Sequence, residues 1–115
     1  MLKPELTHNS LKQDHLAGIF SALGDPTRLG LVASLLKEDE QTLSSLADTS
    51  PLTRQGLTRH LQVLEDAGVV ESTRVGRERL FRLSPEPFRD MQDYLAQVSQ
   101  RWDEALLRLQ SFVEE

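Results

Sequence analysis

Arginine side chains gather between residues 53 and 83, and they are the groups in this sequence best suited to bind an anion. This segment holds six arginines and four acidic residues, although the whole chain carries a net charge of −5. Arginine can form paired hydrogen bonds with guanine or with a phosphate, and glutamine can do the same with adenine. The residue types therefore predict contacts with nucleic acid, provided that the local elements turn these side chains outward.

Two helices joined by a short turn are predicted around the first of these arginines. Thr42 can cap a short helix, and the breaker-rich run 49–51 separates it from a longer helix, residues 53–68, which Thr53 can cap. The buried face of the longer helix is predicted from three leucines at helical spacing, Leu57, Leu61 and Leu64. The opposite face, rich in polar residues, is then left for a ligand.

The outward face of the 53–68 helix supplies the first set of predicted DNA contacts: Thr53, Arg54, Gln55, Thr58, Arg59 and His60. Arg54 and Gln55 lie in the first turn, which is the part of a recognition helix that usually enters the major groove. Thr58 can contact a phosphate or a thymine methyl group, and Arg59 is expected on the backbone. For His60, a structural hydrogen bond and a DNA contact remain equally open.

A β-hairpin is predicted over residues 69–83, with its turn at Gly76 and Arg77. Phe81 and Leu83 can face the core. A hairpin directly after a helix-turn-helix has the position of a wing. The predicted wing contacts, to phosphates or to the minor groove, are Arg74, Arg77 and Arg79. Arg82 is farther from the tip and is predicted to be only a surface residue.

The last helix, residues 86–113, carries an apolar stripe with alternating steps of three and four residues, as in a heptad repeat. A helix this long, about 40 Å, would extend beyond a small domain, so we expect a homodimer, with the first helix, residues 11–23, joining the interface. The predicted dimer contacts are Leu16, Ile19, Phe20, Met91, Leu95, Val98, Trp102, Leu109 and Phe112.

The remaining segments complete a fold that is mainly α with a small β-hairpin. Asp25 and Pro26 begin a second helix, and residues 37–41 are predicted as a loop. We predict that the buried face of the second helix consists of Leu29, Val32, Ala33 and Leu36. Residues 1–10 are expected to be a flexible lead, and residues 11–115 a single winged helix-turn-helix domain with N- and C-terminal helices at the dimer interface.

Composition excludes several classes of protein. The absence of cysteine removes disulfides and thiolate metal sites. The sequence has no apolar run long enough to span a bilayer, so a cytoplasmic protein without a membrane partner is expected. It also lacks a glycine-rich phosphate loop after a strand and a nucleophile in a known setting. We therefore predict that the protein is not an enzyme and needs no cofactor.

Three stretches of the sequence resemble the ArsR/SmtB family of bacterial regulators. They are ALGDPTRL at 22–29, LTRQGLTRHL at 52–61 followed by VLEDAGVV at 63–70, and VGRER at 75–79 followed by FRL at 81–83. The resemblance covers nearly the whole chain. It implies a winged helix-turn-helix that binds an inverted repeat in double-stranded DNA as a homodimer and represses transcription, its own promoter included.

Within that family the sequence resembles a metal-independent subgroup. Thr42 and Ser44 stand where the thiolate ligands of the metal sensors would fall, and the last helix contains no histidine, so no metal site is expected. Gly56 replaces the usual alanine, either as a tolerated defect or to let the backbone approach a phosphate. Two alternatives stay open, a protein-interaction module and a metal-responsive sensor with an unrecognised site. No small-molecule effector is identified.

Overall fold

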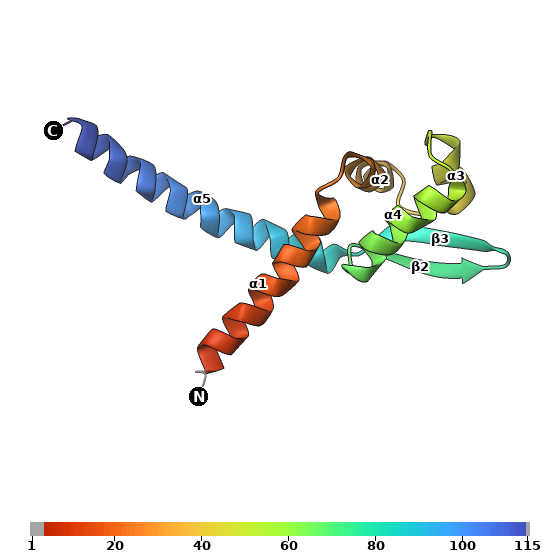
Figure 1. The fold of residues 1–115 in the computed structure, drawn as a ribbon, viewed down its shortest axis with the longest axis horizontal. Helices are drawn as coiled ribbons and strands as arrows, with labels where there is room; N and C mark the ends of the chain where they lie inside the picture. Colours follow the sequence, from red (N-terminus) through yellow and green to blue (C-terminus); the bar gives the residue numbers. More distant parts are fainter. Residues whose placement is uncertain (1–3, 115) are drawn as a thin grey trace.

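The computed structural model describes residues 4–114, with side chains from residue 12 onward, and its helices surround one end of a small sheet (Figure 1). The predicted class, mainly α with a β-hairpin, is confirmed. In chain order the elements of this range are α1 (Pro4–Leu23), α2 (Pro26–Lys37), β1 (Gln41–Thr42), α3 (Leu43–Asp48), α4 (Arg54–Asp66), β2 (Val70–Val75), β3 (Glu78–Leu83) and α5 (Pro85–Glu114).

The first helix begins earlier than predicted. Residues 4–10 were expected to belong to a flexible lead, but α1 starts at Pro4 rather than at Leu11. Proline suits the first position of a helix because the backbone N–H that it lacks would have no partner there. Residues 1–3 of the expected lead lie outside the described residues.

The helix-turn-helix forms from local signals, as predicted. Thr42 caps α3 by accepting a hydrogen bond from the Ser45 N–H at 3.1 Å. Thr53 caps α4 in the same way through the N–H of Gly56 at 3.0 Å. Past the end of α4, the N–H groups of residues 68 and 69 bond back to the carbonyls of residues 65 and 64. These two bonds are the Schellman pattern, which fixes where the helix stops.

The wing belongs to a three-stranded antiparallel sheet with the strand order β1-β3-β2. Its two-residue turn has Gly76 at the first central position with a φ of +64°, a backbone conformation that glycine adopts without strain. The short strand β1 was not predicted, because residues 37–41 were expected to be a loop. Gln41 is instead paired with Phe81, and its buried side chain donates hydrogen bonds to the Ser34 carbonyl and hydroxyl.

The core lies where α1, α2 and α4 pack around the sheet. Every leucine of the predicted inner face of α4 is at most 1% exposed. Phe81 is buried and Leu83 packs partly against the core, as predicted for the wing. The buried cluster consists of Ile19, Ala22, Leu31, Val32, Leu35, Leu46, Leu57, Leu61, Leu64, Val69, Val70, Phe81 and Met91.

Three of the predicted dimer contacts are buried within the chain itself. Leu16 and Ile19 of α1 are 5% and 0% exposed, and Met91 near the start of α5 is 7% exposed. The prediction placed them at an interface between subunits, and it is wrong for these three residues. A periodic apolar stripe shows that a face must be covered, but the stripe does not identify the covering element. Here α1 crosses the beginning of α5, so each helix helps to cover the other (Figure 1).

The buried face of α2 also differs from the prediction. Val32 is buried as expected, but Leu29 and Leu36 are 53% and 67% exposed and Ala33 is exposed as well. Leu31 and Leu35 are buried in their place. Because α2 is apolar on both sides, its periodicity allows either face to turn inward, and packing against the sheet and α4 selects one.

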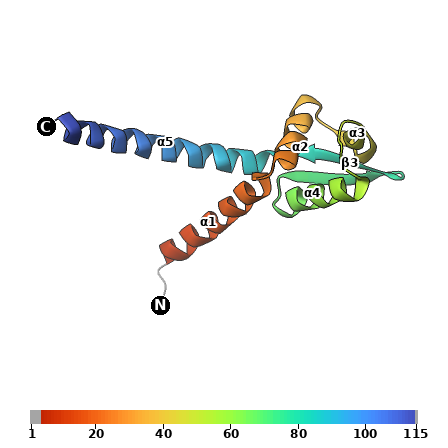
Figure 2. The same ribbon diagram turned by 45° about the horizontal axis from the view of Figure 1, so that its top comes forward.

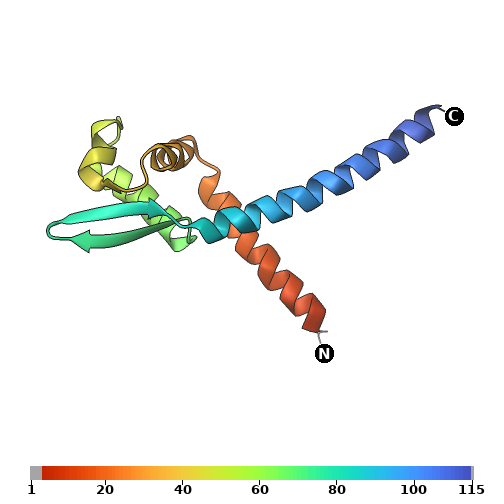
Figure 3. The same ribbon diagram turned by 180° about the vertical axis from the view of Figure 1, so that it is seen from behind.

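Most of α5 extends away from the rest of the molecule (Figures 2 and 3). The chain has a radius of gyration of 18.8 Å and extents of 65 × 41 × 21 Å. A compact chain of this length would have a radius near 13 Å. The predicted length of α5 agrees with the structure to within one residue at each end, and the projecting part carries the remaining apolar stripe into solvent.

Candidate nucleic-acid interface

The outer face of α4 is polar and open. With its leucines turned inward, the helix leaves Arg54, Gln55, Thr58 and Arg59 exposed, as the sequence predicted. Thr53 is exposed too, but its hydroxyl is engaged as the helix cap. A Cβ atom on Gly56 would lie 3.3 Å from that hydroxyl oxygen. Glycine at position 56 therefore leaves room for the cap. This is a third explanation for the glycine, beside a tolerated defect and a close approach of the backbone to a phosphate.

His60, predicted as a DNA contact, turns toward the N-terminus of α2. Its Nδ1 atom accepts a hydrogen bond from Arg28 Nη1 at 3.1 Å and lies 3.8 Å from an Asp25 carboxylate oxygen. Because arginine can only donate, Nδ1 must be the unprotonated nitrogen in this arrangement. The structural hydrogen bond predicted as one alternative for His60 is present, and its DNA contact stays a prediction.

Asp25 organises the same corner of the molecule. Its carboxylate accepts hydrogen bonds from the backbone N–H groups of Thr27 and Arg28, at 2.9 and 3.1 Å. The Arg28 N–H bond is the main cause that holds the pKa of Asp25 below its ordinary value, and the nearby Arg28 guanidinium acts in the same direction. The Arg28 Nε group also donates to the carbonyl of Ala22, the last buried residue of α1. The corner thus joins α1, α2 and α4.

The wing arginines at positions 74, 77 and 79 are exposed. Arg77 lies in the turn, and Arg74 and Arg79 are directly opposite each other on β2 and β3. Like charges directly opposite in an antiparallel pair repel each other. Arg82 is separate from this group, because its side chain pairs with Glu71 at 3.1 Å and lies 3.9 Å from Glu40, in agreement with its prediction as a surface residue.

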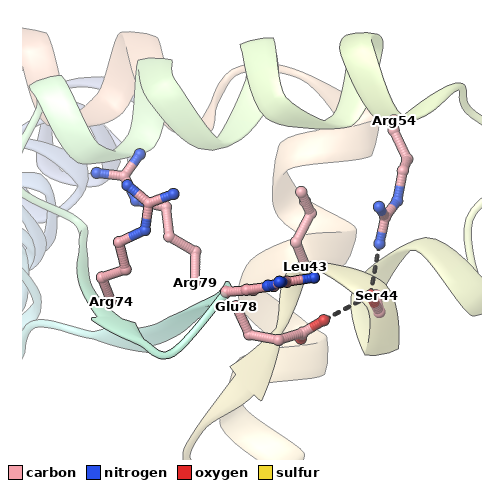
Figure 4. A pocket seen from close by; sticks show the side chains of 7 residues that line it. Leu43, Ser44, Arg54, Arg74, Glu78 and Arg79 are labelled. Atoms are coloured by element: carbon pink, nitrogen blue, oxygen red, sulfur yellow. Dashed lines mark hydrogen bonds between the residues drawn. The ribbon is translucent and has the colours of Figure 1, made fainter.

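A cleft of about 380 Å3 lies between α4, α3 and the wing, and we call it the arginine cleft (Figure 4). The described residues that line it are Leu43, Ser44, Arg54, Arg74, Arg77, Glu78 and Arg79. The first turn of α4 and the wing tip are about 20 residues apart in the sequence, and the fold joins their arginines in this one concavity. The arrangement favours an anion with several charged oxygens, such as a nucleic-acid backbone.

Two polar residues of the arginine cleft, Ser44 and Glu78, were not predicted from the sequence as site residues. Arg54 Nη2 donates to the hydroxyl of Ser44, and that hydroxyl donates in turn to Glu78 Oε1 at 3.2 Å (Figure 4). Nothing in the sequence near Ser44 predicts this contact. Glu78 offered a weak signal, since it is an acidic residue between the wing arginines.

The other candidate surface is the projecting part of α5. Leu95, Trp102, Leu109 and Phe112 are between 52% and 79% exposed, and Val98 is half-buried. Phe20 of α1 lies beside this region, and its ring centroid is 5.8 Å from that of Tyr94. The predicted dimer contacts therefore divide into three that are buried in the core, Leu16, Ile19 and Met91, and six that are partly or largely exposed, Phe20 on α1 and the other five along α5.

Two further findings concern the described residues alone. None of their helices is long and apolar enough to cross a membrane. They also contain no group of three or more histidine, aspartate or glutamate side chains placed to hold a metal ion.

Comparisons of this chain with known proteins agree on one family. The family described as Helix-turn-helix domain matches residues 23–73. The chain is 41% identical to the uncharacterised HTH-type transcriptional regulator YuzN of Bacillus subtilis, over 64% of this chain and 86% of that protein. It is 34% identical to the HTH-type transcriptional repressor SmtB of Mycobacterium tuberculosis, over 62% of this chain but only 52% of that protein.

A solved structure extends the comparison to the fold. The ArsR-like transcriptional regulator from Rhodococcus sp. RHA1 superposes with a TM-score of 0.74 at 34% identity, over 87% of this chain and 93% of that one. Because sequence identity and shared fold extend over most of both chains, the protein belongs to the ArsR/SmtB family of winged helix-turn-helix transcriptional regulators, which bind DNA and are not enzymes.

Proposed function

We propose that this regulator is a repressor that binds an inverted-repeat operator as a homodimer. In this proposal, residues 53–68 form the recognition helix, residues 69–83 the wing and residues 86–113 the dimerisation helix. Arg54 and Gln55 read base edges in the major groove, while Thr58 and Arg59 contact the backbone beside it. Arg74, Arg77 and Arg79 hold phosphates or the adjacent minor groove.

The arginine cleft is the observation that carries the proposal. Four arginines from α4 and the wing share it, two of them directly opposite each other in the hairpin. Such a cluster is electrostatically unfavourable in the free protein and becomes favourable when phosphates neutralise it and release their counterions. The residues outside 53–83 carry a net charge of −7, which disfavours contacts of those segments with DNA.

The exposed stripe of α5 supports the homodimer. Trp102, Leu109 and Phe112 project into solvent on one side of a helix that extends beyond its own core. Leaving large apolar side chains in water costs about 25 cal/mol per Å2, and a second copy brings an identical stripe to cover them. A two-fold dimer places its recognition helices about 34–36 Å apart, which matches half-sites one turn of DNA apart.

The repressor role follows from the similarity to SmtB, which carries that name, and from the position of the DNA-contacting elements. A dimer on an operator that overlaps a promoter excludes RNA polymerase by occupancy. Adding the protein to an in vitro transcription reaction on its own upstream DNA should then reduce the transcript. An increase in the transcript would contradict repression while leaving DNA binding intact.

Selection of bound duplexes from a random-sequence pool tests the proposal most directly. The expected result is an enriched inverted repeat with half-site centres about 10 base pairs apart. Light scattering at micromolar concentration should give twice the mass of the chain. Enrichment of a single, unrepeated site would overturn the inverted-repeat operator. A chain that stays monomeric and still binds the enriched duplex would overturn the homodimer.

A further inference from the structure

Arg54 is held within the arginine cleft by two hydrogen bonds in series. Its Nη2 group donates to Ser44, whose hydroxyl donates to Glu78 Oε1 at 3.2 Å. A hydroxyl that accepts from a cation and donates to an anion is polarised in both directions, so each bond strengthens the other. The series links the recognition helix to α3 and to the wing (Figure 4).

The two residues that hold Arg54 are themselves on a rigid frame. Ser44 lies in the first turn of α3, directly after β1, and β1 pairs with β3 through Thr42 and Leu80. Glu78 is the first residue of β3. Because this strand pairing joins the backbones of α3 and the wing, Ser44 and Glu78 start from neighbouring positions, and their hydrogen bond provides a partner that orders the long side chain of Arg54.

The series leaves Arg54 able to bind a base. Guanidinium has five N–H donors, and the bond to Ser44 uses one of them, so a paired contact with guanine remains available. A side chain that is already ordered loses less conformational entropy when it binds.

Glu78 has a second effect, because it brings a negative charge into the arginine cleft. It is the single acidic residue among the described residues that line the cleft. A carboxylate in this place weakens the attraction for any phosphate, whatever the DNA sequence. The same residue therefore orders a base-reading side chain and reduces binding that does not depend on sequence.

We propose that Glu78 and Ser44 are positioning residues for Arg54, and that the charge of Glu78 also lowers the affinity for DNA of any sequence. This proposal rests on the assignment of Arg54 as a base reader in the proposed function. The positioning role is tested by the specificity ratio, the affinity for a duplex selected by the wild-type protein divided by the affinity for its shuffled counterpart. The effect of the Glu78 charge is tested by the affinity for the shuffled duplex.

Two variants separate the two effects. Ser44→Ala breaks both hydrogen bonds but keeps the charge of Glu78, so the specificity ratio should fall about three- to tenfold while affinity for the shuffled duplex changes little. Glu78→Gln keeps an oxygen that can accept from Ser44 but removes the charge. Affinity for the shuffled duplex should then rise about three- to tenfold, with a steeper salt dependence.

Matched controls lie outside the arginine cleft. Ser72→Ala breaks another hydroxyl–carboxylate bond, from Ser72 to Glu65, and Glu71→Gln removes a charge from the adjacent strand. Neither should change the specificity ratio beyond about twofold, because neither residue lines the arginine cleft or contacts Arg54. Ser44→Thr keeps a hydroxyl and should restore the wild-type ratio. Thermal unfolding of each variant verifies that the fold is intact.

The double variant Ser44→Ala/Arg54→Ala tests whether Ser44 acts through Arg54. If Ser44 acts through Arg54, adding Ser44→Ala to Arg54→Ala should lower the specificity ratio no further. An additive loss in that double variant, or a folded Ser44→Ala protein with an unchanged ratio, overturns the positioning role. An unchanged affinity of Glu78→Gln for shuffled DNA overturns the proposed effect of the Glu78 charge. Failure of the wild-type protein to enrich any sequence overturns the proposed function, and this proposal with it.

Discussion

Helices α4 and α5 are both amphipathic, but they leave opposite faces open. In α4 the leucines at 57, 61 and 64 are at most 1% exposed, and the polar face is free. Beyond its first turns, α5 has an apolar face that is more than half exposed at Leu95, Trp102 and Phe112. Since the open face selects the kind of partner, α4 is suited to a polyanion and α5 to another apolar surface.

The largest expected effect comes from placing a charge on the open face of α5. Trp102→Glu should convert the proposed dimer to a monomer and reduce operator affinity at least about 100-fold, because two linked recognition helices bind far more tightly than one. Light scattering and a DNA-binding titration measure the two effects.

Leu107→Glu provides the matched control for Trp102→Glu. Leu107 is 64% exposed on the same helix but lies about 140° around the axis from Trp102. This variant should remain a dimer. If both variants dissociate, or if neither does, the stripe that includes Trp102 is not the dimer interface.

The next largest effect concerns the buried leucine face of α4. Leu57→Ala should lower the free energy of unfolding by about 2–5 kcal/mol, because it leaves a cavity in a fully buried site. Leu36→Ala on the exposed side of α2 should change it by less than about 0.5 kcal/mol. Denaturant titration measures both. A large loss from Leu36→Ala would show that the other face of α2 is buried in solution.

An arginine on the open polar face of α4 and one in the turn of the wing should behave differently. Arg54→Ala should reduce discrimination at one or two base pairs by about 1–3 kcal/mol. Arg77→Ala should weaken binding to all sequences and lower the slope of log K against log salt by about one. Binding curves on selected and shuffled duplexes at several salt concentrations distinguish the two. An equal loss of specificity from both would mean that their roles are misassigned.

The smallest expected effect concerns the corner that joins α4 to the other helices. The pKa of Asp25 is lowered on folding, so its charge stabilises the fold above the unfolded value of 3.8, and this stability is lost as the pH falls through the folded pKa. Asp25→Asn keeps a cap without that charge. The difference in unfolding free energy between wild type and Asp25→Asn should therefore shrink below pH 3.8. A difference that grows on acidification would contradict the assigned direction.

The sequence determined the order of the helices and of the two hairpin strands, and the ends of several helices. Thr42, Asp25 and Thr53 cap their helices through contacts within three residues, so local spacing was sufficient to place them. The leucine face of α4 was equally readable, because that helix has only one apolar side. The turn at Gly76 followed from the backbone freedom of glycine.

Tertiary structure decided what depends on distant neighbours. Packing chose between the two apolar faces of α2, and it placed Leu16, Ile19 and Met91 inside the chain's own core. It also paired Gln41 with β3. A periodic pattern says that a face will be covered, but the covering element comes from elsewhere in the chain. For the same reason, the series from Arg54 through Ser44 to Glu78 has no signature in the sequence, since it joins side chains 10 and 34 residues apart.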